Sequence, residues 1–256
     1  SNKSDSMDSR KIARTLQAGL LQGVHVASLQ TSGDRHLFRY RKRLWSDLVR
    51  TKNRIKDKFL FYGITIPPQW DNPYWSKAFL RWVAEVEMPS ASVRLTLDLL
   101  LEQYHLIYRH FLKTSVQVRK LLRTARYKEQ GKLLRTIPGI GPLTAVQLLV
   151  ELEDINRFTS FKKLNSYVGF RPTTHSSGDA DRKGRMTYRR HNALRSALVE
   201  CAWQSVQKDP AMMIRYEEVV KRGSKKRAIV VMARKLLSRI YHVLKTQEPY
   251  QLGKAA

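Results

Sequence analysis

The chain has 256 residues, of which 48 are Lys or Arg and 21 are Asp or Glu, so its formal net charge is +27. A single cysteine, Cys201, excludes an intrachain disulfide and a four-cysteine zinc site. No apolar run approaches the ~18–20 residues of a membrane span, and residues 1–9 are too polar for a signal peptide. With 42% hydrophobic residues, the composition predicts a folded cytoplasmic protein with a buried core.

The charge favours a polyanionic partner. A strongly positive surface repels itself in water, and a nucleic acid relieves that repulsion while it releases condensed counterions. The cations are spread along the chain among apolar residues rather than gathered in a tail, which is typical of a folded nucleic-acid-binding protein. A protein that is merely basic is the alternative. A membrane-surface role is disfavoured because no basic amphipathic segment stands apart from a core.

The first half of the chain has the periodicity of helices. The spacing of apolar residues predicts a helix over 8–21, followed by a short strand over 24–29. Apolar residues at steps of three and four then trace one face of a long helix that starts near Asp34. Three prolines between residues 63 and 73 end that helix, and a shorter helix is predicted over 74–85.

A second long helix is predicted from Ser90, because its apolar residues repeat every 3.5 residues as in a coiled-coil seam. The seam runs through Val93, Leu97, Leu100, Tyr104, Ile107, Phe111, Thr114, Val118, Leu121 and Ala125. The sequence therefore predicts a mainly α fold, in which residues 31–130 form an antiparallel helical arm. Residues 131–256 are predicted to form a compact α-helical domain, with an amphipathic helix over 229–244.

A glycine turn lies at the start of the compact domain. The stretch Pro138-Gly139-Ile140-Gly141-Pro142 separates two helical segments and resembles the helix-hairpin-helix element of DNA-binding proteins. Gly139 and Gly141 permit positive φ and a close approach of the backbone to a phosphate. Amides at the start of the next helix attract an anion. An ordinary helix corner without a ligand is the alternative.

A polar loop further along contains a candidate nucleophile, Ser177. A serine hydroxyl that attacks a phosphodiester needs fixed cations around the scissile phosphate. The residues that follow supply candidates for this and for nucleic-acid binding: Arg182, Lys183, Arg185, Arg189, Arg190, Asn192 and Arg195. An ordinary turn is the alternative for the serine, and His175 and His191 are interpreted as solvated loop histidines.

Two carboxylates near the start of the chain, Asp5 and Asp8, are candidate metal ligands. They are three residues apart and share one face of a helix. Such a pair can hold Mg²⁺, which usually takes further ligands. Acidic residues are also common at helix N-termini because of the helix dipole, and this is the alternative.

These elements together resemble the transposases of the insertion-sequence 110/116 family, the DEDD-type serine recombinases. The matching motifs follow in the family's order over nearly the whole chain: Lys3-Ser4-Asp5 with Asp8-Ser9, Pro138-Gly139-Ile140-Gly141, Gly169-Phe170-Arg171-Pro172, Ser177-Gly178 and Asn192-Ala193-Leu194-Arg195. His191 stands where a glycine often precedes the last motif. Residues 1–30 are interpreted as the remnant of an RuvC-like domain, most of which is missing.

The resemblance implies a DNA transposase that cuts and rejoins strands through a covalent phosphoserine link. Ser177 is the implied nucleophile, with Ser176 as the fallback, and Asp5 and Asp8 are the last two acids of a Mg²⁺-binding tetrad. A structured guide RNA and a homodimer or tetramer are implied partners, with no membrane partner. Because half of the tetrad is missing, this chain is expected to bind nucleic acid and to recombine poorly or not at all.

Two other classes stay open on the sequence alone. The first is a non-catalytic, basic nucleic-acid-binding protein that dimerises through its helical arm. The second is a helix-hairpin-helix repair enzyme such as a glycosylase, which needs a catalytic Lys or Asp soon after the hairpin. The residues found at that place are Glu151, Glu153 and Asp154.

Overall fold

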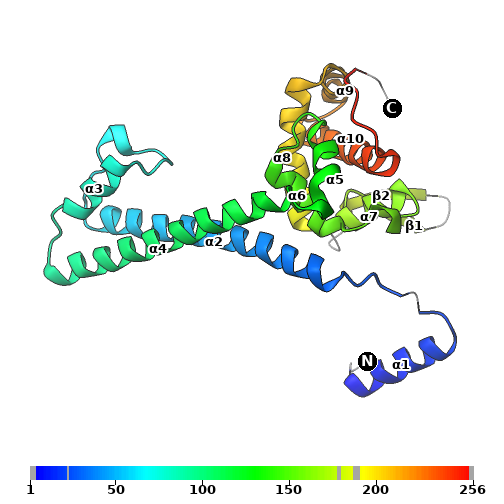
Figure 1. Cartoon of the computed structure of the whole chain (residues 1–256), viewed down its shortest axis with the longest axis horizontal. Coiled ribbons are helices and arrows are strands. Elements are labelled where there is room, and N and C mark those ends of the chain that lie inside the picture. The colour runs from blue at the N-terminus through cyan, green and yellow to red at the C-terminus, as the bar shows by residue number, and fades with distance from the viewer. Residues whose placement is uncertain (1–3, 22, 178–179, 187–190, 254–256) are drawn as a thin grey trace.

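The computed structural model describes residues 4–21, 23–177, 180–186 and 191–253, and the side chains of 172–190 lie outside this description. Ten α-helices and one two-stranded sheet occur within the described residues, so the predicted mainly α fold class is confirmed. Figure 1 shows a long helical arm that reaches away from a body of shorter helices, which holds the C-terminus.

The arm consists of two long helices, α2 (Leu29–Phe61) and α4 (Ala91–Leu121), which run antiparallel to each other (Figure 1). Aromatic contacts set their register. The ring of Trp45 on α2 lies 5.5 Å from that of Phe111 on α4, and the guanidinium of Arg41 lies 4.7 Å from the same Phe111 ring. The sequence pattern of alternating steps is therefore realised as one helix face packed on another.

Helix α2 begins at Leu29, five residues before the predicted start at Asp34, and the strand predicted over 24–29 is wrong. Residues 23–28, which precede Leu29, have no regular secondary structure. Ser28 caps the helix, and its own amide donates to the Glu153 carboxylate at 3.0 Å. A side chain from the body thus fixes the residue that caps α2. Local composition, which suggested a strand, does not reveal this contact.

The far end of the arm has a hydrophobic core of its own. Helix α2 ends at Phe61, where Gly63 follows with a φ of +67°, rather than at the prolines that were predicted to end it. A short 3₁₀ helix, η1 (Pro68–Trp70), and helix α3 (Lys77–Glu85) then fold back over the helix pair. The buried members of this core are Leu48, Ile55, Phe59, Phe79, Val83, Leu97, Leu101 and Tyr104. Leu97 and Tyr104 belong to the predicted seam of α4, and supercoiling of the pair stays a prediction.

Helix α1 (Asp5–Gln17) begins and ends earlier than the predicted range of 8–21. Ser4 caps it, because its hydroxyl accepts a hydrogen bond from the Met7 amide at 3.3 Å. None of the residues of α1 is buried, and Figure 1 shows the helix apart from the arm and the body.

The body packs around α10, whose buried face includes Leu236, Leu237 and Ile240, so the amphipathic pattern predicted over 229–244 is confirmed. None of the described helices combines the length and the apolar composition that crossing a bilayer requires. The helices of the body are α5 (Ala125–Arg135), α6 (Pro142–Leu152), η2 (Ile155–Arg157), α7 (Phe161–Val168), α8 (Asn192–Lys208), α9 (Pro210–Lys221) and α10 (Lys225–Thr246).

The polar stretch interpreted as a loop is instead an antiparallel β-hairpin. Strand β1 (Pro172–Ser177) pairs with β2 (Ala180–Met186), with a register irregularity near the start of β1. Its sequence lacks apolar alternation, the usual sign of a half-buried strand, which is why the pattern indicated a loop. Gly178 and Asp179, which follow β1 in the sequence, lie outside the described residues.

Candidate functional site

Gly139, in the turn between α5 and α6, adopts the positive φ that the sequence predicts, at +91°. A Cβ at this position would lie 2.5 Å from the Cys201 carbonyl oxygen and 3.0 Å from the Ser205 amide nitrogen, both in the backbone of α8. The close approach made possible by Gly139 is therefore to another helix. Internal packing accounts for this glycine without a ligand.

Gly141 differs from Gly139. It has an ordinary φ of −86° at the N-cap of α6, so the positive φ that a glycine permits is not used at this position. A Cβ placed there would have no neighbour within 4 Å, which leaves the backbone open on that side. Phosphate binding at this turn stays a prediction, and within the Gly-Ile-Gly motif Gly141 is the residue with space for it.

The β-hairpin carries the candidate nucleophile. Ser177 is the last residue of β1, and its Cα is paired with that of Ala180. The next pair toward the base of the hairpin is Ser176 with Asp181. The backbone thus places both candidate serines at the end of the hairpin where the two strands connect.

Part of the predicted cationic group lies on the same two-stranded ribbon. Arg182 and Lys183 pair with residues 175 and 174 of β1, and Arg185 is further along β2. The side chains of these residues, like that of His175, lie outside the described part of the structure. Arg189 and Arg190 lie outside it entirely, so the arrangement of cations around Ser177 stays a prediction.

Helix α8 begins immediately after this region, and His191 caps it. The Leu194 amide donates to Nδ1 of His191 at 3.2 Å, and Nε2 lies 3.2 Å from Oε2 of Glu151. Because Nδ1 accepts, the ring proton is assigned to Nε2, which donates to the carboxylate. The interpretation of His191 as a solvated loop residue is therefore wrong.

Two predicted nucleic-acid-binding residues, Asn192 and Arg195, lie on the first turn of α8. Asn192 is exposed and Arg195 is half-buried, with its guanidinium carbon 5.8 Å from the Phe170 ring centre. Both line a shallow groove with Ser196, Val199 and Glu200. The structure thus brings these two residues together at the surface, directly after the hairpin.

A buried carboxylate, Glu151 of α6, connects the start of α8 to the arm. Its side chain is 2% exposed. Arg39 of α2 binds it with two hydrogen bonds, from Nε to Oε1 at 2.9 Å and from Nη2 to Oε2 at 2.7 Å, and Nε2 of His191 lies 3.2 Å from the same Oε2. Burial alone raises the pKa of Glu151, but the hydrogen bonds from His191 and Arg39 outweigh it and lower the pKa from 4.5 to about 2. Glu151 is therefore ionised and fully engaged.

The second acid after the hairpin, Glu153, is also engaged. Its Oε2 lies 2.7 Å from His25 Nε2, and its Oε1 accepts from the Ser28 amide. Burial raises its pKa, and hydrogen bonds led by the Ser28 amide lower it to about 2. Because Glu151 and Glu153 are both committed to internal contacts, neither is available as a proton acceptor. This argues against either glutamate as the base of a repair enzyme. Asp154, the third acid after the hairpin, is exposed, and it caps η2 by accepting from the Asn156 amide at 2.8 Å.

The carboxylates proposed as metal ligands do not form a complete site. Asp5 and Asp8 lie in the exposed first turn of α1. In the part of the chain that the structure describes, no three His, Cys, Asp or Glu side chains are grouped as a metal site requires. Two carboxylates on a helix without a buried residue do not fit the near-octahedral shell of Mg²⁺ without further ligands.

The contacts of Glu151 with Arg39 and His191 were not predicted from the sequence, although the pattern of polar residues in α6 pointed to them. Gln147 and Glu151 are the two polar side chains in an otherwise apolar turn-and-a-half of α6, and both are buried. Gln147 donates to the Ala193 carbonyl oxygen at 2.9 Å, and so it also holds the first turn of α8. Buried polar groups at a four-residue spacing indicate partners elsewhere in the fold.

Comparison with known proteins identifies the class to which this arrangement is similar. Residues 131–217, which include the glycine turn, the hairpin and α8, match the family model described as "Transposase IS116/IS110/IS902 family". Among individual proteins, the chain is 24% identical over 262 residues to the transposase for insertion sequence element IS1111A of Coxiella burnetii, covering 99% of this chain and 70% of that protein.

Two further relatives cover less of their own length. A putative transposase, y4qE, of Sinorhizobium fredii is 25% identical over 202 residues, covering 78% of this chain and 47% of the relative. The pilin gene-inverting protein of Moraxella bovis is 34% identical over 130 residues, covering 50% of this chain and 40% of the relative. The chain thus spans between 40% and 70% of these relatives.

Proposed function

We propose that this chain is the strand-joining part of a DNA transposase of the insertion-sequence 110/116 type, with Ser177 as the nucleophile. The observation that carries the proposal is the match of residues 131–217 to that family, because this segment contains Ser177 and all the cations assigned to it. The net charge of +27 supports DNA as the substrate.

In the proposed step, Oγ of Ser177 attacks the phosphorus of a phosphodiester. The Oγ–P bond forms while the bond from phosphorus to one deoxyribose oxygen breaks; the serine proton passes to solvent, and the departing oxygen becomes a hydroxyl. Arg182, Lys183 and Arg185 stabilise the charge that develops on the phosphate. A hydroxyl of another strand then attacks the phosphoserine, which joins the strands and restores the serine without an external energy source.

We assign three further components to this function. Asp5 and Asp8 would supply two carboxylates to a Mg²⁺ site that needs further acids to complete it, and a metal held there would supply Lewis-acid polarisation of phosphate oxygens. A structured RNA selects the DNA sequences to be joined. The protein acts as a dimer or tetramer, because strand exchange joins two duplexes. No step of the serine chemistry above depends on a metal geometry in this chain.

The serine assignment is tested by trapping a covalent protein–DNA adduct on supercoiled DNA that carries the joined ends of the element. A bridging phosphorothiolate at the junction, on the 3′ or the 5′ side, gives a leaving group that needs no protonation and so lowers the demand for the metal site. Transcripts of the element's non-coding end are added in a parallel reaction.

We expect an SDS-resistant adduct with the wild-type chain and with Ser176→Ala, and none with Ser177→Ala. Adduct formation by Ser177→Ala contradicts the assignment, and DNA binding without any adduct favours the binding-protein alternative.

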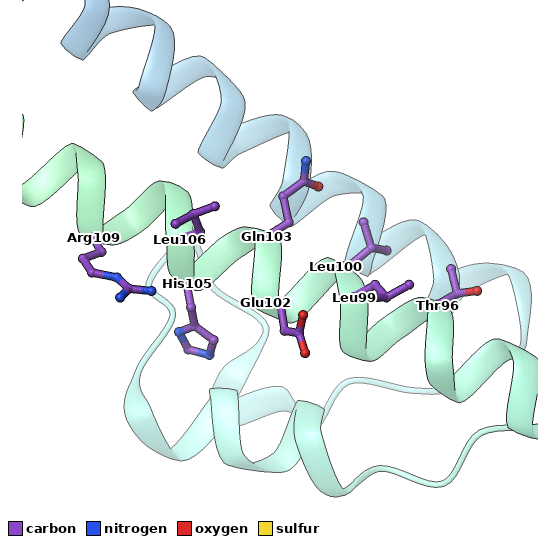
Figure 2. Close-up of a pocket in the computed structure, with 8 residues that line it drawn as sticks. All are labelled: Thr96, Leu99, Leu100, Glu102, Gln103, His105, Leu106 and Arg109. Atoms are coloured by element: carbon purple, nitrogen blue, oxygen red, sulfur yellow. The ribbon is translucent and has the colours of Figure 1, made fainter.

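The outer face of α4 is the surface that we assign to a second copy of the chain. Leu95, Leu99 and Leu106 are 61%, 56% and 47% exposed there. Figure 2 shows Glu102 and Arg109 on one side of α4, a heptad apart. In an antiparallel pair of α4 helices, the Glu102 of each copy meets the Arg109 of the other, so the face is complementary to itself.

We expect the wild-type chain to sediment as a dimer, or as a larger even-numbered assembly. Leu99→Glu combined with Leu106→Glu is expected to yield monomers, because each buried carboxylate faces an apolar partner surface. Leu60→Glu at the far end of α2 is the matched control, since Leu60 is 81% exposed and lies away from this face. A monomeric wild type in sedimentation velocity, or a double variant that remains dimeric, contradicts the assignment.

A further inference from the structure

The turn between α9 and α10 is the densest cluster of positive charge in the described chain outside the residues already discussed. Helix α9 ends at Lys221 and α10 begins at Lys225. Five of the seven residues from 221 to 227, which we call the basic turn, are Lys or Arg, and none is acidic. All seven are exposed.

Helix electrostatics does not explain this placement. Lys221 lies at the C-terminal end of α9, where a cation is favourable. Lys225, Lys226 and Arg227 instead fill the first turn of α10, next to the partial positive charge of the helix N-terminus, where acidic residues are preferred. The first turn of α10 contains no acidic residue. The charges of these three residues therefore interact unfavourably with the dipole of α10.

Core packing does not require the three cations either. The buried face of α10 begins at Ala228 and Ile229, one residue after the cluster. Ser224 already caps the helix, because its hydroxyl accepts from the Arg227 amide at 3.3 Å. Glutamine in place of Lys225 or Lys226 would leave these contacts intact, so the folded chain gives no structural reason for the charge.

No carboxylate neutralises the basic turn within the described residues, since none of its cations forms an ion pair there. A nearby acid on α9, Glu218, is bound by Arg215 at 2.6 Å. Its pKa is lowered first by that hydrogen bond, and the charges of Arg215 and Arg222 lower it further. The positive charge of the turn is therefore available to an anion from outside the chain.

We propose that the basic turn binds the phosphate backbone of duplex DNA. This contact lies beyond residues 131–217, the segment that matches the transposase family, and is separate from the glycine turn, the hairpin and the start of α8. The inference rests on the proposed function in one respect, namely that the partner is DNA. Several cations on a short exposed turn match the closely spaced charges of a duplex, about one per 1.7 Å of helix axis. Such a contact positions the DNA and reads no sequence.

The test compares two triple variants of the chain by fluorescence anisotropy with a labelled DNA duplex, from about 50 to about 200 mM salt. The first carries Lys225→Gln, Lys226→Gln and Arg227→Gln. The matched control carries Lys42→Gln, Arg43→Gln and Arg54→Gln, three exposed cations of α2 that also form no ion pair among the described residues. We expect the slope of log affinity against log salt to fall by about 2–3 in the first variant, because each lost phosphate contact removes ~0.9. The control keeps the wild-type slope.

The thermal midpoint separates lost binding from lost folding. Because the three cations oppose the dipole of α10, the first variant is expected to unfold at a temperature equal to or above that of the wild type, although it binds DNA more weakly. An equal loss of slope in both variants, or no loss in the first, overturns the inference. A loss seen only with an RNA duplex overturns the DNA assignment. Failure of the wild-type chain to bind DNA overturns the proposed function itself, and is recognised before the variants are compared.

Discussion

Gly139→Ala is expected to destabilise the folded chain by about 3 kcal/mol or more. The new Cβ would lie 2.5 Å from the Cys201 carbonyl oxygen, which belongs to the backbone of α8 and cannot rotate away. The positive φ of +91° adds strain of roughly 1–2 kcal/mol for a residue with a side chain, and the forced separation of the helices adds about 1–3 kcal/mol. Chemical denaturation followed by circular dichroism measures the loss.

Gly141→Ala is the matched control two residues away in the same turn. Its φ of −86° suits alanine and the new Cβ meets open space, so stability should change by no more than ~0.5 kcal/mol. If the turn also binds a phosphate, Gly141→Ala lowers DNA affinity without lowering stability. Equal losses of stability in the two variants would show that the turn does not pack on α8 as described.

Arg39→Met is expected to destabilise the chain by about 2 kcal/mol at neutral pH. The variant keeps the aliphatic stem but removes both hydrogen bonds to the buried Glu151 carboxylate. Removing one partner of a fully buried pair costs ~3–5 kcal/mol, and the effect is smaller here because the Arg39 side chain is 50% exposed. Arg43→Met, one turn further along α2 at an exposed position, should cost no more than ~0.5 kcal/mol.

The effect of Arg39→Met on stability should depend on pH, because the ionised Glu151 carboxylate is responsible for it. The pKa of Glu151 is lowered from 4.5 to about 2 in the folded chain, so its contacts contribute stability above pH 4.5 and lose it as the pH falls toward 2. Arg39→Met raises this pKa, and the gap in unfolding free energy between wild type and variant should therefore close over that range. A gap that stays constant from pH 7 to pH 2 would mean that the loss arises from packing rather than from the ion pair.

Local periodicity was enough to predict that α2, α4 and α10 are helices. The amphipathic steps of α10 and the alternating steps of α4 are properties of neighbouring residues, and the predicted face of α10 is buried. The predicted seam of α4 is buried at Leu97, Tyr104, Thr114 and Val118, but α4 ends at Leu121, and Ala125 is an exposed residue of α5. The start of α2 was misjudged because Ser28 is fixed by Glu153, which lies 125 residues away in sequence. Helix ends depend on such caps more than on periodicity.

Contacts between distant segments explain what the sequence did not reveal about the candidate site. Arg39 and Glu151 are 112 residues apart, and no motif spacing links them. The positive φ of Gly139 was predictable from residue type, whereas its contact with α8 depends on tertiary packing. The hairpin was missed because its strands are polar on both sides of the connection.

The most direct test of the central proposal is to identify the residue that becomes covalently bound to DNA. After trapping on the phosphorothiolate junction, nuclease and protease digestion leave a nucleotide on one peptide, which tandem mass spectrometry locates. A nucleotide bound through phosphate to Oγ of Ser177 is the predicted result. Modification of a different residue, such as Ser176 or a tyrosine, would contradict the assignment of the nucleophile at the end of β1.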